Sequence, residues 1–165
     1  MHAPRNVVFY DPVVKAHYYG TPAEGDCFPL AVLHLLEENL CANDLREMTY
    51  SEIVSFVRNG TQNWRILLAY ANGKMIASDD DDPDTVIEKY RKYWFSGRTY
   101  YQTAEILALS TALQRRIVII DRGRVYDGHD SAQFNLAFPG NKTLRIRFSG
   151  DGRAGHYEPF LDEVR

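Results

Sequence analysis

The chain contains 165 residues, of which 45% are hydrophobic and 25% charged, a size and composition typical of one domain with a buried core. Its 19 basic and 22 acidic side chains leave a net charge of −3, so it lacks the positive footprint of non-specific nucleic-acid binding. Its apolar runs are far shorter than the roughly 20 residues that span a bilayer, and its first residues lack the apolar stretch of a signal peptide. We therefore expect one monomeric domain over residues 1–165, with neither nucleic acid nor a membrane as partner.

The first two thirds of the chain are predicted to be mainly helical. An extended stretch at residues 7–14 comes first. Helical periodicity and capping signals then predict helices from Cys27 to about Leu40, from Ser51 onward, and at residues 63–71, 84–93 and 102–113. Asp82 or Asp84 is expected to cap the helix at residues 84–93.

The pattern then changes from helical to extended. Residues 117–120 form a continuous apolar run, which is typical of a central strand. Leu144, Ile146 and Phe148 alternate with polar residues, as in a half-exposed strand. Helices followed by strands indicate an α+β fold in which the sheet packs on the helices.

The two cysteines, Cys27 and Cys41, differ in their surroundings. The segment between them is helical in character, and a single helix would separate their Cα atoms by about 21 Å. A disulfide requires roughly 4.4–6.8 Å, so the two should not pair. Free thiols suit a reducing compartment, in which a cysteine can act as a nucleophile. Cys27 is expected to begin a helix and Cys41 to end one.

Cys27 has the local sequence of a residue at a helix N-terminus. Gly25 allows a tight turn, and Pro29 is tolerated only in the first helical turn. Unpaired N–H groups at such an end favour a thiolate and can face an oxyanion. Glu24 and Asp26 disfavour a thiolate by their charge, so activation requires a histidine. The competing interpretation is that Cys27 is a small buried hydrophobic residue without chemistry.

Of the five histidines, His156 has the arrangement of a catalytic base. Residues i and i+2 of an extended segment share a face, so the Glu158 carboxylate can orient the His156 imidazole. A surface pair of little energetic value is the alternative. The remaining histidines are assigned to a terminus, to packing or structural roles, or to an exposed turn: His2, His17, His34 and His129.

The sequence resembles the ovarian-tumour (OTU) family of deubiquitinating cysteine proteases over residues 24–160. Residues 24–27 read Glu-Gly-Asp-Cys before an apolar helix, where the family has Asp-Gly-x-Cys. Residues 94–97 read Trp-Phe-Ser-Gly, and a helix with Glu and Leu and then an apolar strand follow, as in the family. Residues 156–158 read His-Tyr-Glu, where the family has His-Tyr and then Asn, Asp or Glu. Glu24, Glu158 and Pro29 each depart from the commoner family residue.

This resemblance implies a papain-like OTU-type fold, with a small mixed or antiparallel sheet packed against helices and the nucleophile at the N-terminus of a central helix. It implies that Cys27 is the nucleophile and His156 the base, that Glu158 or Glu24 is the orienting acid, and that the backbone N–H groups of Asp26 and Cys27 form the oxyanion hole. No metal or other cofactor is needed. The implied partner is ubiquitin or polyubiquitin, with ubiquitin-like modifiers as a variant. The implied location is the cytoplasm, that of a host if a pathogen encodes the chain.

Two other functions remain open at this point. The first is an inactive ubiquitin-binding module that keeps the OTU fold. The second is another papain-like enzyme, because the same Cys and His order serves several reactions.

Overall fold

The structure is a computed structural model that describes residues 7–21, 25–36, 38–68, 70–71, 74–76, 78–97, 99–127, 142–150 and 155–161. Its helices are α1 (Cys27–Leu35), α2 (Ala42–Asn59), α3 (Trp64–Leu67), α4 (Pro83–Trp94) and α5 (Thr103–Leu113). Its strands are β1 (Val8–Asp11), β2 (Ala16–Tyr19), β3 (Tyr70–Ala71), β4 (Lys74–Met75), β5 (Ile117–Asp121), β6 (Arg124–Asp127), β7 (Leu144–Ser149) and β8 (His156–Pro159).

The main sheet has four strands in the order β6-β5-β7-β8. The β5 and β7 strands are parallel, whereas β6 and β8 pair antiparallel with their neighbours, so the sheet is mixed. The β1–β2 hairpin lies next to this sheet, joined to it by an antiparallel bridge between Tyr18 and Phe160. The strands β3 and β4 form a separate small hairpin. The expected α+β class with a small sheet is confirmed.

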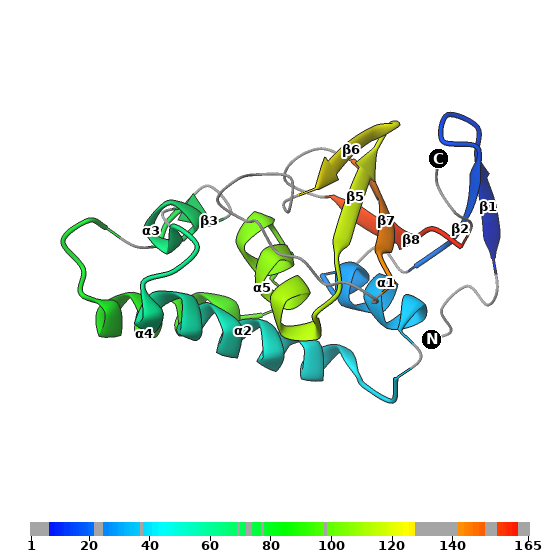
Figure 1. Cartoon of the computed structure of the whole chain (residues 1–165). Coiled ribbons are helices and arrows are strands. Elements are labelled where there is room, and N and C mark those ends of the chain that lie inside the picture. The colour runs from blue at the N-terminus through cyan, green and yellow to red at the C-terminus, as the bar shows by residue number, and fades with distance from the viewer. Residues whose placement is uncertain are drawn as a thin grey trace.

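The helices α1 and α5 pack on this sheet, and α2 packs on α5 with α4 beside it. Figure 1 shows α2 and α4 side by side, α5 between α2 and the sheet, and α1 against β8. The buried face of α1 includes Phe28, Ala31 and Val32, each at most 1% exposed. A helix that is buried this deeply, and that contacts both the strands and α2, provides a rigid base for its first residue.

The boundary between α1 and α2 differs from the prediction. The first helix ends at Leu35, five residues before its predicted end at about Leu40. The second begins at Ala42, so Ser51, its predicted start, lies inside the helix. Cys41 does not end a helix but caps the start of α2, where the Asp44 carboxylate accepts a hydrogen bond from the Cys41 N–H at 2.9 Å. This capping box was missed because the usual sequence signal is Ser or Thr followed by Glu or Gln.

Several short strands were also missed. The helix predicted at residues 63–71 is confined to Trp64–Leu67 and is followed by β3. The extended stretch predicted at residues 7–14 ends at Asp11, whose Oδ1 accepts hydrogen bonds from the Val13 and Val14 N–H groups and so starts a turn. The strands therefore do not all follow the helices.

The remaining elements agree with the prediction. The bounds of α4, α5, β5 and β7 lie within one or two residues of those expected. Asp82 caps α4, because its carboxylate accepts a hydrogen bond from the Thr85 N–H at 2.8 Å. None of the helices described is both long and apolar enough to cross a membrane.

Candidate active site

Cys27 is the first residue of α1, directly after the turn that Gly25 and Asp26 form. Its side chain is buried, and its Sγ lies 3.9 Å from the carbonyl oxygen of Gly155. Cys27 and Cys41 are both free thiols, and Cys41 is exposed at the surface. The thiol of Cys27 therefore faces the start of β8, where the last part of the described chain returns to α1.

His156 and Glu158 occupy alternate positions on β8 and contact each other. The imidazole Nε2 lies 3.6 Å from Glu158 Oε2, and both side chains are largely buried. The pKa of His156 is raised to about 9, first by its interaction with the Cys27 side chain and then by Glu158, whereas burial opposes the shift. The imidazole is therefore cationic at neutral pH. The structure thus brings Cys27, His156 and Glu158 together.

Glu158 is held by a second cation, which the sequence reasoning did not find. Arg147 of β7 lies opposite Glu158 in the sheet register, and its Nη1 donates to Glu158 Oε1 at 3.0 Å. Its Nε donates to Asp11 Oδ2 at 2.9 Å, and the guanidinium lies 4.3 Å from the centre of the Tyr18 ring. Because Arg147 occupies one oxygen of Glu158, the other oxygen faces His156.

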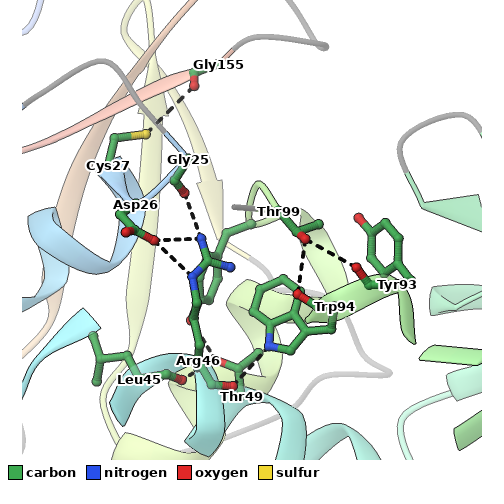
Figure 2. A network of polar contacts seen from close by, with 11 residues as sticks. Gly25, Asp26, Cys27, Leu45, Arg46, Thr49, Tyr93, Trp94, Thr99 and Gly155 are labelled. Atoms are coloured by element: carbon green, nitrogen blue, oxygen red, sulfur yellow. Dashed lines mark hydrogen bonds and ion pairs between the residues drawn. The ribbon is translucent and has the colours of Figure 1, made fainter. Parts of the chain in front are cut away.

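The turn before Cys27 is held by Arg46 of α2 (Figure 2). Its Nε and Nη2 lie 3.0 and 2.9 Å from Asp26 Oδ1, and Nη2 donates to the Gly25 carbonyl at 2.9 Å. The guanidinium lies near the rings of Trp94 and Tyr101, at 4.9 and 5.5 Å from their centres. No signal in the sequence marks Arg46, because its role depends on how α2 packs against the turn.

Of the other candidate residues, His17 and His34 pack against tyrosines. Glu24, His2 and His129 are outside the described residues. His34 stacks on Tyr19 with ring centres 4.3 Å apart, and the His17 ring packs edge-on against Tyr10. In the described part of the chain, no group of three or more metal-binding side chains comes together.

A cavity of about 610 Å³ begins beside the candidate site. Gly155, which borders Cys27, lines it together with Phe148 and Tyr157. Its wall is mostly apolar but includes the carboxylates of Glu105 and Asp121. Cys27, His156 and Glu158 do not line the cavity, and the contact of Gly155 with Cys27 joins it to the site.

A thiol at a helix N-terminus, faced by a histidine and a carboxylate from a sheet, is the arrangement of papain-like cysteine proteases. Neither a scan against protein-family models nor a search of curated proteins returns a match. Solved structures do match. An OTU domain solved in complex with ubiquitin superposes with a TM-score of 0.57 at 18% identity, covering 87% of this chain and 67% of that one.

Two further solved structures are similar. The OTU domain of OTUD1 has a TM-score of 0.55 at 14% identity, covering 88% of this chain and 85% of that one. The viral OTU domain protease from Dera Ghazi Khan virus has a TM-score of 0.48 at 17% identity, covering 96% of both chains. The first two matches establish the fold. The chain has the fold of an OTU domain, as the sequence resemblance predicted.

Proposed function

We propose that this domain is a deubiquitinase of the cysteine-protease type, with Cys27, His156 and Glu158 as its catalytic residues. The proposal is supported by one observation above all, which is the contact of His156 with both Cys27 and Glu158 at the N-terminus of α1 in an OTU fold. Glu24, the acid three positions before the nucleophile, is proposed as a further acid of the site.

In the proposed reaction, the Cys27 thiolate attacks the carbonyl at the C-terminus of ubiquitin, in an isopeptide or peptide bond. A sulfur–carbon bond forms, His156 gives its proton to the leaving amine, and the carbon–nitrogen bond breaks. His156 then takes a proton from water, which hydrolyses the thioester and releases the thiol. Glu158 orients the imidazole, and the backbone N–H groups of Asp26 and Cys27 stabilise the oxyanion.

The cavity beside Gly155 is proposed to receive the substrate tail. The tail of ubiquitin ends in Gly-Gly and is basic, which suits a cavity lined in part by an acidic residue. Asp121 lines the cavity, and its Oδ1, which accepts no hydrogen bond from the described residues, lies 3.7 Å from Arg122 Nε. We propose that it faces a basic side chain of the tail. Ubiquitin-like modifiers with similar tails are proposed as further substrates, and the active form as a monomer in the cytoplasm.

The proposal is tested with ubiquitin that carries a thiol-reactive group at its C-terminus. Folded wild-type protein is expected to form a covalent adduct at Cys27, which mass spectrometry of the peptides locates. Cys41→Ser removes the other thiol and is expected to react like the wild type, whereas Cys27→Ala is expected not to react. If folded wild-type protein forms no adduct under reducing conditions, the proposed function is wrong.

A fluorogenic ubiquitin C-terminal amide and a panel of ubiquitin dimers then measure turnover. Adduct formation without turnover would indicate a reactive but non-hydrolytic module. Turnover that Cys27→Ala abolishes is the result expected for a deubiquitinase.

A further inference from the structure

Asp26 occupies the N-cap position of α1, but its side chain does not cap the helix. A capping aspartate accepts a hydrogen bond from the N–H of the second or third helical residue. The third residue of α1 is Pro29, which has no N–H, so only Phe28 is left as such a donor. The Asp26 carboxylate instead accepts from Arg46 of α2. The Asp26 carboxylate, which would normally bind the N-terminus of its own helix α1, is therefore bound to α2.

Arg46 is itself fixed in position. Its side chain is 8% exposed, and its Nη2 also donates to the Gly25 carbonyl. Its backbone carbonyl accepts a hydrogen bond from Trp94 Nε1 at 3.0 Å, so the helix that carries it is tied to α4 (Figure 2). A planar guanidinium that donates to two adjacent residues sets the direction of both. The contacts thus define the course of the chain just before Cys27.

We propose that Arg46 is a positioning residue that holds the Asp26 carboxylate away from the N-terminus of α1 and so keeps its negative charge away from the amides that face the oxyanion. The inference rests on the proposed function, because only an acyl-transfer reaction develops an oxyanion at Cys27. A carboxylate bound to the Phe28 N–H would place a negative charge beside the Asp26 and Cys27 amides, where the tetrahedral intermediate develops its own.

Arg46→Met tests the proposal, because methionine fills the space between the aromatic rings but cannot hold a carboxylate. The freed Asp26 side chain is expected to turn onto the Phe28 N–H. With a fluorogenic ubiquitin amide as substrate, kcat is expected to fall by about 100-fold, the order of effect seen when one oxyanion donor is lost. KM is expected to stay within about twofold, because ground-state binding of ubiquitin does not use the oxyanion.

The double variant Arg46→Met/Asp26→Ala separates this role from a structural one. Removing the freed carboxylate is expected to restore kcat at least about tenfold over Arg46→Met, since its negative charge no longer opposes the oxyanion. A purely structural role predicts the opposite, because a second lost contact adds to the damage. Arg58→Met, on the same helix in an exposed pair with Asp84, is the matched control and is expected to keep the wild-type kcat.

Arg46→Lys provides a second test if the Arg46→Met variant does not fold. Lysine retains the charge beside Asp26, so kcat is expected to stay within about tenfold of the wild type, and adding Asp26→Ala should then give no recovery. The inference is overturned if folded Arg46→Met keeps the wild-type kcat, or if the double variant is no faster than Arg46→Met. Either result leaves adduct formation by the wild type, and with it the proposed function, intact.

Discussion

At the scale of single residues, the candidate site is a line of side chains with alternating charge. Asp11, Arg147, Glu158 and His156 follow one another at contact distances of 2.9, 3.0 and 3.6 Å. Each buried carboxylate faces a cation, which offsets the cost of removing its charge from water. The ionisation of His156 therefore depends on Glu158. Arg147 holds Glu158, and Asp11 of the β1–β2 hairpin holds Arg147.

The stability of the fold should depend on pH through His156. Its pKa rises from 6.5 to about 9 on folding, so its contribution is fully present below pH 6.5 and is lost as the pH rises through 9. Between pH 6.5 and 9.5, the free energy of unfolding is expected to fall by about 1–3 kcal/mol more in the wild type than in His156→Gln. Urea denaturation at each pH measures this difference.

His34→Gln is the control for this measurement. His34 is exposed and stacks on Tyr19, away from the candidate site, so its variant is expected to follow the wild-type pH dependence. Parallel curves for the wild type and His156→Gln would contradict the prediction.

The sequence could indicate His156 and Glu158 because both belong to one extended segment, in which a spacing of two fixes their common face. It could not indicate Arg147 or Arg46. Arg147 meets Glu158 through the register of β7 and β8, and Arg46 meets Asp26 through the packing of α2. Neither contact is marked by a pattern in the local sequence.

At the scale of elements, the position of β8 depends on a glycine. A Cβ on Gly155 would overlap the Phe148 ring of β7, so either that ring or the start of β8 would have to move. His156 is the next residue along the chain, and the Gly155 carbonyl borders Cys27. The close approach of the two strands is therefore part of the geometry of the candidate site.

Gly155→Ala is expected to slow the reaction of Cys27 with the ubiquitin probe by about tenfold or more, because relieving such an overlap costs about 1–3 kcal/mol. Gly97→Ala is the matched control, since a Cβ there has nothing within 4 Å. The rates are measured by mass spectrometry on proteins whose folding is checked by circular dichroism. Equal rates for the two variants would show that β8 does not need this close approach.

The predicted elements were most accurate where a long periodic pattern ended in a strong local signal, as in α4, which begins after the capping Asp82. The predicted elements were wrong where the local sequence signal was weak or where tertiary contacts decide the structure. Cys41 is a rare capping residue, and the apolar composition of residues 30–36 contains no stop, although the helix ends at Leu35. Strands as short as β3 are set by pairing and leave little trace in the sequence.

At the scale of the whole molecule, the β1–β2 hairpin is joined to the main sheet by a few links. They include the bridge between Tyr18 and Phe160, the hydrogen bond from the Leu161 N–H to the His17 carbonyl, and the ion pairs of Arg147. Ala16 and Tyr18 of the hairpin also pack in an apolar cluster with Val118, Ile120 and Phe160. The Arg147 links are charged and largely buried, so removing Arg147 alone would leave buried carboxylates without their ion pair.

Arg147→Met is expected to destabilise the fold by about 2–4 kcal/mol, because it leaves the buried carboxylate of Asp11 without its ion pair and Glu158 with His156 alone. Arg145→Met, two residues earlier on the same strand and face, is expected to change stability by at most about 0.5 kcal/mol. Chemical denaturation measures both values, and hydrogen exchange should show the largest loss of protection in β1 and β2. Identical denaturation midpoints for the two variants would refute this assignment.

The order of residues along the chain has a consequence for biosynthesis. Cys27 is synthesised before all the described helices except its own, whereas Arg147, His156 and Glu158 follow all of those helices in the sequence. The long-range pairing of β7 with β8 and the packing of α1 against both must be complete before the thiol meets its histidine. In a nascent or partly folded chain, the Cys27 thiol therefore has no histidine beside it. Cys27 is activated only in molecules that have finished folding.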